Sequence, residues 1–237
     1  MKFTHGIWFD REDTSIYNAV EVGDVTRSNG NEIRALCTTR HVCHRGDTLN
    51  HPTITVKLSS PAPEIIAGTA YHFSGAGSKL PRFELFPEGL PIELGRVTDD
   101  PQTNSVSLKS GGVRAVLDKN PRSFNISYRS EESGVKLTDL GMSCVQYIIA
   151  PPHTEASYPP LASTTIADPY YRAPLSSSKR PYMALSFGLQ VGELVYGLGE
   201  RFGPFAKNGQ HIDLWNEDAG TASPYGQSPC LKYLLMS

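Results

Sequence analysis

The chain has 237 residues, and its 22 basic and 24 acidic side chains give a net charge of −2 with no basic tract, which argues against a nucleic-acid partner. The length allows one large domain or two small ones around a substantial core. Its 21 glycines and 18 prolines favour a turn-rich β protein over a helical one.

The N-terminal residues show neither an export signal nor a membrane anchor. Charged residues 10–13 come too early for the apolar core of a signal peptide. No stretch reaches the roughly 18 apolar residues of a transmembrane helix. We therefore expect a cytoplasmic protein without a membrane partner. Its cysteines are then predicted to be free thiols, at Cys37, Cys43, Cys144 and Cys230.

Three segments alternate apolar and polar residues with a period of two, which is typical of a half-buried strand. They are Thr53–Leu58, Ser123–Tyr128 and Met183–Gln190. Glycine-containing turns at residues 28–31 and 111–112 predict two hairpins. No segment longer than about ten residues keeps the 3.6-residue apolar stripe of a helix. The sequence therefore predicts an all-β fold, an antiparallel β-sandwich, because a second sheet is the simplest cover for an apolar sheet face.

Residues 151–182 interrupt this pattern with a high density of proline. Such density prevents strand pairing, so we predict a long Pro/Ser-rich surface loop or linker. The prolines lie at positions 151, 152, 159, 160, 169, 174 and 181.

A group of soft and imidazole side chains follows the first hairpin, at Cys37, His41, Cys43 and His44. One interpretation is a metal site, and the other is a strand end with a loop. On a strand, His41 and Cys43 would share a face and His44 would point away. Because no second cluster has zinc-like spacing, we expect no metal. The next residues, Arg45-Gly46-Asp47, predict a tight turn closed by an Arg–Asp pair rather than an integrin ligand.

The most informative segment lies near the end of the sequence. Three glycines, at positions 197, 199 and 203, stand where a strand ends and a loop begins, and Asn208-Gly209 predicts a turn. Trp215 then offers a flat apolar face, and Asn216, Glu217 and Asp218 offer polar groups. Aromatic stacking beside carboxylates is typical of sugar recognition. A hairpin whose acids are merely solvated fits the composition equally well.

Glu217 and Asp218 are not predicted to be a catalytic pair. A retaining glycosidase needs two carboxyl groups about 5–5.5 Å apart on opposite sides of the sugar. Adjacent residues of an extended loop point in opposite directions and do not bracket one glycosidic bond.

The run Val191–Phe202, continued by Lys207–Gln210 and Trp215–Thr221, closely resembles glycoside hydrolase family 31 and, within it, the α-xylosidases. His44–Asn50 with Pro52-Thr53, and Pro81–Pro87, resemble the same branch. The resemblance spans most of residues 1 to about 225.

This resemblance implies a galactose-mutarotase-like β-sandwich over residues 1–225. In the family, a (β/α)8 barrel with two catalytic aspartates follows the sandwich. A sandwich loop reaches over the barrel mouth, and the aspartate that closes its Trp-Asn-x-Asp motif binds substrate. Here that aspartate is Asp218, with Trp215 and Asn216 in the same loop.

The chain departs from the family in two respects. A barrel needs roughly 250 residues of alternating strand and helix, and no such pattern follows the sandwich. Residues 226–237 no longer follow the family and are expected to be an atypical tail. The Pro/Ser-rich stretch around 151–182 also matches the family poorly.

We therefore expect the N-terminal part of a retaining α-glycosidase for α-xyloside-like substrates, with no catalytic residue, metal or cofactor of its own. Its partners would be an α-linked sugar and the missing barrel, and oligomerisation of the complete enzyme is left open. The alternatives are a stand-alone carbohydrate-binding or structural sandwich, and a mutarotase, whose His and Glu pattern is not recognisable here.

Overall fold

The computed structural model describes residues 3–5, 9–28, 30–72, 95–151, 179–198, 203–210, 212 and 234–236. The chain divides into two units, Lys2–Gly188 and a second unit that contains Leu189–Ser237, and each is described by itself. Strands dominate the described residues, whose single helix is the short 3₁₀ helix η1 (Arg45–Thr48). No helix in these ranges is both long and apolar enough to cross a bilayer. The predicted all-β class is confirmed.

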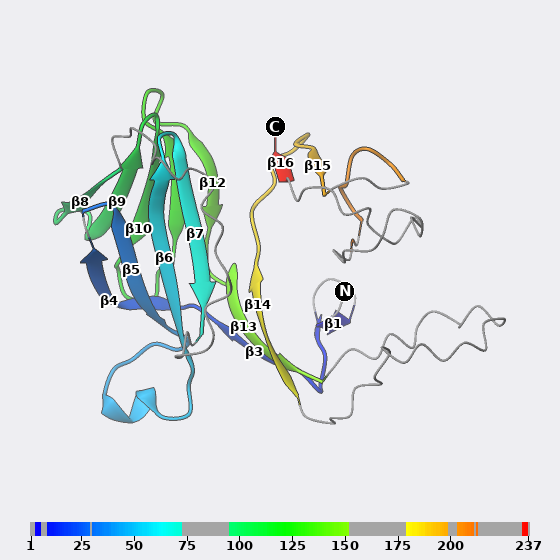
Figure 1. The fold of residues 1–237 in the computed structure, drawn as a ribbon. Coiled ribbons are helices and arrows are strands. Elements are labelled where there is room, and N and C mark those ends of the chain that lie inside the picture. Colours follow the sequence, from blue (N-terminus) through cyan, green and yellow to red (C-terminus); the bar gives the residue numbers. More distant parts are fainter. Residues whose placement is uncertain are drawn as a thin grey trace, which may run out of the picture. The chain divides into compact units, whose positions relative to one another are not determined.

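One sheet of the first unit has the antiparallel order β4-β5-β6-β7 (Figure 1). Its strands are β4 (Glu21–Ser28), β5 (Glu32–Thr38), β6 (Thr53–Ala62) and β7 (Ile65–Tyr71). The predicted alternation along β6 is confirmed, because Ile54, Val56 and Leu58 are buried and the residues between them are less so. The hairpin predicted at residues 28–31 joins β4 to β5.

A second antiparallel sheet has the order β12-β11-β10-β9-β8. Its strands are β8 (Arg96–Asp100), β9 (Ser105–Ser110), β10 (Val113–Asp118), β11 (Ile126–Ser130) and β12 (Lys136–Leu140). The hairpin predicted at Gly111-Gly112 is confirmed, with Ser110 opposite Val113. Gly111 has φ of 56°, a left-handed conformation that glycine adopts at little steric cost.

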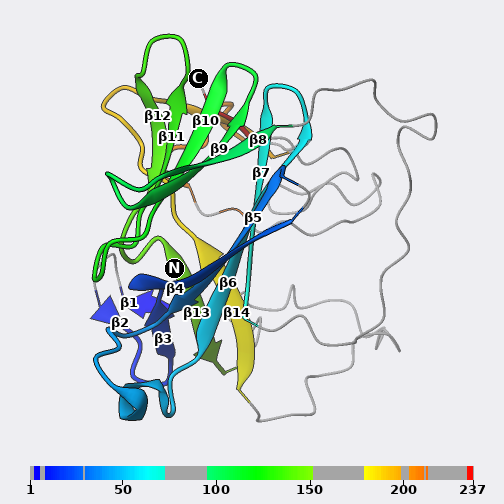
Figure 2. The same ribbon diagram turned by 90° about the vertical axis from the view of Figure 1, so that its left-hand side faces the viewer.

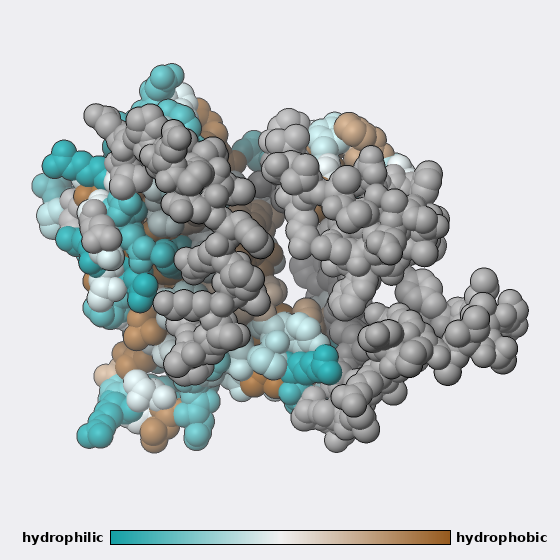
Figure 3. Space-filling view, viewed as in Figure 1, coloured by the Kyte–Doolittle hydropathy of each residue, from teal (hydrophilic) through white to brown (hydrophobic). Residues whose placement is uncertain are grey.

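The core lies between these two sheets, which form two layers in Figures 1 and 2. Alternating strand positions supply its buried side chains, together with Ala19 and Phe124, which lie outside the strands. They include Ile33, Cys37, Ile54, Val56, Leu58, Val106, Leu108, Ala115, Leu117, Phe124 and Ile126. Polar contacts also join the two sheets, because the Ser110 hydroxyl lies 2.8 Å from the Ser60 hydroxyl and donates to the Ala62 carbonyl at 3.1 Å. Hydrophilic residues cover much of the described sandwich surface in Figure 3, as expected for the outward positions.

A third sheet of the same unit has the order β14-β13-β3, formed by β3 (Ser15–Asn18), β13 (Val145–Ala150) and β14 (Arg180–Leu185). The sequence prediction was wrong here at both ends of β14. The strand begins inside the predicted 151–182 loop, because Pro181 is tolerated in an edge strand. It ends at Leu185, whereas the alternation predicted a strand to residue 190, and Phe187 is 41 % exposed. Residues 152–178 of the predicted loop lie outside the described residues.

Two short antiparallel pairs complete the described strands. β1 (Thr4–His5) pairs with β2 (Phe9–Asp10), and β15 (Val195–Gly197) pairs with β16 (Leu234–Met236). Part of the predicted tail 226–237 therefore forms a strand in the second unit. Residues 226–233 and 237 lie outside the described residues.

Candidate functional site

The predicted substrate-binding residues Trp215, Asn216 and Asp218, and their neighbour Glu217, lie outside the described residues. The structure does describe the segment that leads to them, residues 189–198 and 203–210. This segment is called the loop root below. Its geometry can be compared with the sequence prediction of a strand that ends in a glycine-rich loop.

The side chain of Asn208 ties the loop root together. Its Oδ1 accepts a hydrogen bond from the Val195 backbone N–H at 2.8 Å, and its Nδ2 donates to the Glu193 carbonyl at 2.9 Å. The Lys207 N–H donates to the Val195 carbonyl at 2.7 Å. The amide of Asn208 thus acts as a strand partner next to β15 and satisfies two backbone groups that would otherwise need water.

The backbone turns sharply where β15 ends. Gly197 has φ of 98° and Leu198 has φ of 71°, and Gly203 and Gly209 also have positive φ. A left-handed leucine is uncommon and costs conformational energy, so the surrounding contacts must hold it in place. The glycines and the Asn208-Gly209 turn fulfil the conformational role predicted from the sequence. Gly199 lies outside the described residues.

Both formally charged side chains of the loop root support its backbone. The Glu193 carboxylate accepts from the Gln190 N–H at 2.7 Å, and the Lys207 ammonium donates to the Pro204 carbonyl at 2.6 Å. The rings of Tyr196 and Phe205 pack with their centroids 5.0 Å apart. These contacts suit a rigid base for the residues that follow rather than a catalytic centre.

The group of His and Cys residues is dispersed by the fold. Cys37 lies in the core, where burial raises the pKa of its thiol to about 12. His41 Nδ1 lies 2.7 Å from Oε2 of Glu21, while Cys43 is exposed. Within the described ranges, no three His, Cys, Asp or Glu side chains are grouped as metal ligands. Cys37, Cys43 and Cys144 are free thiols, and Cys230 lies outside the described residues.

Glu21 is a buried carboxylate that sequence reasoning missed. It is 7 % exposed and accepts three hydrogen bonds, from His41, from the Val42 N–H at 2.9 Å and from the Arg122 N–H at 3.1 Å. Burial alone would raise the pKa of Glu21, but these three bonds outweigh it and lower the pKa. In the sequence, the buried role of Glu21 is indicated only by the position of a charged residue at the start of a strand.

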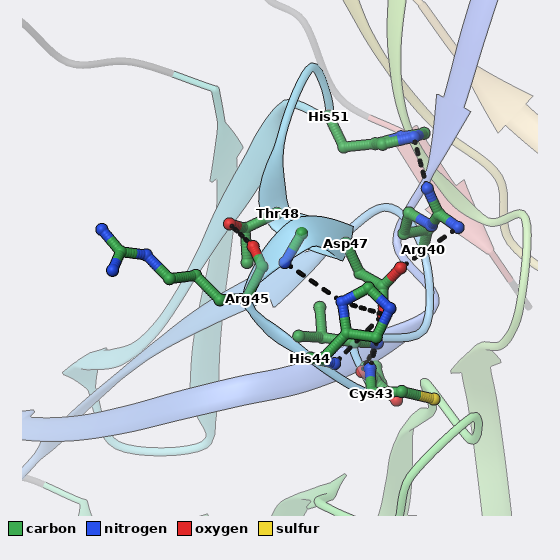
Figure 4. A network of polar contacts seen from close by, with 10 residues as sticks. Arg40, Cys43, His44, Arg45, Asp47, Thr48 and His51 are labelled. Atoms are coloured by element: carbon green, nitrogen blue, oxygen red, sulfur yellow. Dashed lines mark hydrogen bonds and ion pairs between the residues drawn. The ribbon is translucent and has the colours of Figure 1, made fainter.

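The Arg45-Gly46-Asp47 segment forms the first residues of η1, so the predicted turn is present (Figure 4). The predicted charge partner was wrong. Asp47 pairs with Arg40, with 3.4 Å between Oδ1 and Nη2, and Arg45 points away from the network. Asp47 Oδ2 also accepts from the N–H groups of Cys43 at 3.0 Å and His44 at 3.1 Å, and these bonds lower its pKa. The arrangement is a helix cap, in which His44 is the N-cap residue.

Comparison with known proteins identifies relatives of the chain. The family described as the Glycosyl hydrolase 31 N-terminal galactose mutarotase-like domain matches residues 55–230. An alpha-xylosidase from Emericella nidulans is 32 % identical over 231 residues, which cover 94 % of this chain and 27 % of that protein. Alpha-xylosidase XylQ from Lactiplantibacillus pentosus is 30 % identical, over 94 % of this chain and 25 % of its own length.

The chain therefore spans about a quarter of the length of these curated relatives. Among solved structures, an uncharacterized protein from Listeria monocytogenes EGD-e is similar over 88 % of this chain and 15 % of its own, with 15 % identity and a TM-score of 0.45. The family match extends over most of the sequence and includes the loop root. The chain belongs to the glycosyl hydrolase 31 family and corresponds to its N-terminal galactose mutarotase-like domain.

Proposed function

We propose that this chain is the N-terminal domain of a retaining α-glycosidase that hydrolyses α-xyloside-like substrates. The observation that carries the proposal is the family match over residues 55–230, which includes the predicted sugar-binding loop. Two alpha-xylosidases that align over 94 % of the chain support the substrate class.

In this proposal, the domain contributes to the substrate pocket and the barrel of the longer enzyme performs the chemistry. A retaining mechanism uses one carboxylate as nucleophile and another as acid/base. Both would come from the barrel. Asp218 would accept hydrogen bonds from sugar hydroxyls, and Trp215 and Asn216 would shape the same loop. The clamp made by Asn208 supports this role, because a pocket residue must be held by a rigid base to contribute binding energy.

The test compares two neighbouring carboxylates in the complete enzyme. We expect Asp218→Ala to lower kcat/KM for an aryl α-xyloside by an amount equivalent to about 1–3 kcal/mol, the range for losing one partner of a buried polar contact. Glu217→Ala removes the same charge one residue earlier and serves as the matched control. We expect it to leave kcat/KM close to wild type.

Equal kcat/KM for Asp218→Ala and the wild-type enzyme would contradict the pocket role of Asp218. A second assay tests whether the catalytic residues lie outside this chain. The 237-residue chain alone is expected not to hydrolyse aryl α-xylosides, because the proposal places the catalytic carboxylates in the barrel. Turnover by this chain, at a rate above that of a mock purification, would contradict that assignment.

A further inference from the structure

The outer face of the five-stranded sheet holds a row of five basic side chains, one from each strand. Register places Arg96 opposite Lys109, Lys109 opposite Arg114, and Arg114 opposite Arg129. Beyond a register shift between Tyr128 and Arg129, Arg129 lies opposite Lys136. The row faces away from the core, because the adjacent Leu108 and Ala115 are buried between the sheets. With neighbouring strands about 4.8 Å apart, the five side chains cross about 20 Å of surface.

This row is only partly neutralised by its own neighbours. Glu131 pairs with Lys109 at 3.1 Å and with Arg114 at 2.6 Å, and Asp139 pairs with Lys136 at 3.0 Å. In the part of the chain that the structure describes, no carboxylate lies within 4.0 Å of Arg96 or Arg129. Like charges that face each other across strands are destabilising. Because Glu131 holds Arg114 through Nε at 2.7 Å as well as through Nη2, the cations of the row that remain available to an anionic ligand are Arg96 and Arg129.

The next two rows on the same face have a different chemistry. One contains the hydroxyls of Thr98, Ser107 and Ser127, and the other contains Asp100, Ser105 and Asp118. Ser107 and Ser127 are 9 % and 5 % exposed. A basin of about 370 Å³ lies over these rows, with Arg114 and Arg129 among its lining residues together with Asp100 and Asp118.

The combination of rows selects the class of ligand. A polyphosphate or nucleic acid would meet the arginines but would be repelled by Asp100 and Asp118. A neutral sugar would donate to those carboxylates but would leave Arg129 without an anionic partner. A sugar with a carboxylate satisfies both sides, because guanidinium groups match carboxylate geometry and aspartates accept strongly from hydroxyls.

We propose that this basin binds an acidic saccharide, with a uronate carboxylate on Arg129 and ring hydroxyls on the serines, Asp100 and Asp118. The site lies on the outer face of the five-stranded sheet, within the first unit. This proposal does not depend on the proposed function, and a negative result here would leave the glycosidase proposal unchanged.

Calorimetric titration of the 237-residue chain tests the proposal with two disaccharides. Cellobiouronic acid, which carries one carboxylate, is expected to bind, and neutral cellobiose is expected to bind at least about tenfold more weakly, since the charge-assisted bonds are lost. Arg129→Gln should weaken cellobiouronate binding about tenfold. Arg34→Gln removes an exposed arginine from β5, in the other sheet, and should leave the affinity unchanged.

A second variant distinguishes a saccharide from a simple anion. Asp100→Asn removes the negative charge but keeps the Oδ1 acceptor that holds the N–H groups of Gln102 and Thr103. It should weaken cellobiouronate binding and strengthen the binding of inorganic triphosphate. The proposal is overturned if cellobiouronate does not bind or if cellobiose binds as well. It is also overturned if Arg34→Gln and Arg129→Gln weaken binding equally, or if triphosphate binds the wild-type chain more tightly than cellobiouronate. Thermal unfolding of each variant shows that the sandwich is intact.

Discussion

At the scale of single residues, Glu21 connects parts of the chain that are distant in sequence. It receives hydrogen bonds from the 41–42 segment and from Arg122, which lies 101 positions away. We expect Glu21→Gln to lower the free energy of unfolding at pH 7 by about 1–3 kcal/mol, because one amide oxygen cannot replace both carboxylate oxygens as acceptors. Urea unfolding measures the change, with Glu12→Gln, at an exposed turn position, as the control.

The same carboxylate predicts a pH dependence. Its pKa in the folded protein lies below the ordinary value of 4.5. Its contribution to stability is therefore complete above about pH 4.5 and is lost as the pH falls through the folded-state pKa. The stability difference between wild type and Glu21→Gln should narrow over that acidic range. A difference that is constant from pH 7 to pH 3 would show that the carboxylate charge is not what Glu21 contributes.

At the scale of elements, the loop root depends on the Asn208 clamp. Asn208→Ala removes the partners of the Val195 N–H and the Glu193 carbonyl, so we expect amide hydrogen exchange at Val195 to accelerate. Asn208→Asp keeps an acceptor for the Val195 N–H and should retain more of its protection. Equal protection at Val195 in wild type and Asn208→Ala would show that the side chain does not hold the strand.

The elements also show what sequence patterns could and could not predict. Alternation located β6, and the glycine turns located two hairpins, because these signals are local. Asn208-Gly209 was predicted as a turn. The hydrogen bonds of the Asn208 side chain were not predicted, because its partner Val195 lies thirteen positions earlier in the sequence. Likewise, the five basic residues of the row are scattered along the sequence, and only the pairing of the strands brings them side by side. Trp215, Asn216 and Asp218 remain predictions.

At the scale of the whole molecule, stability of the first unit rests on the core between its two main sheets. Phe124 is 1 % exposed in that core, and Phe124→Ala should cost about 3–5 kcal/mol of unfolding free energy. Phe205 is 79 % exposed and belongs to the other unit, so Phe205→Ala is the matched control. Urea denaturation followed by circular dichroism compares the two. A loss below about 1 kcal/mol for Phe124→Ala would mean that the core readily refills the space.

The position of Pro181 has a consequence for behaviour in concentrated solution. The Ser186 N–H donates to the Cys144 carbonyl, so residues 184, 182 and 180 are the hydrogen-bonded positions opposite β13 and Pro181 falls between them. Its nitrogen therefore lies on the outer side of β14, where no strand of the described residues pairs with it, and has no hydrogen to donate. A strand from another molecule that paired with β14 would lack one backbone hydrogen bond at Pro181, next to the charged side chain of Arg180. Such interruptions discourage edge-to-edge aggregation, so this margin of the sheet is protected against fibril growth.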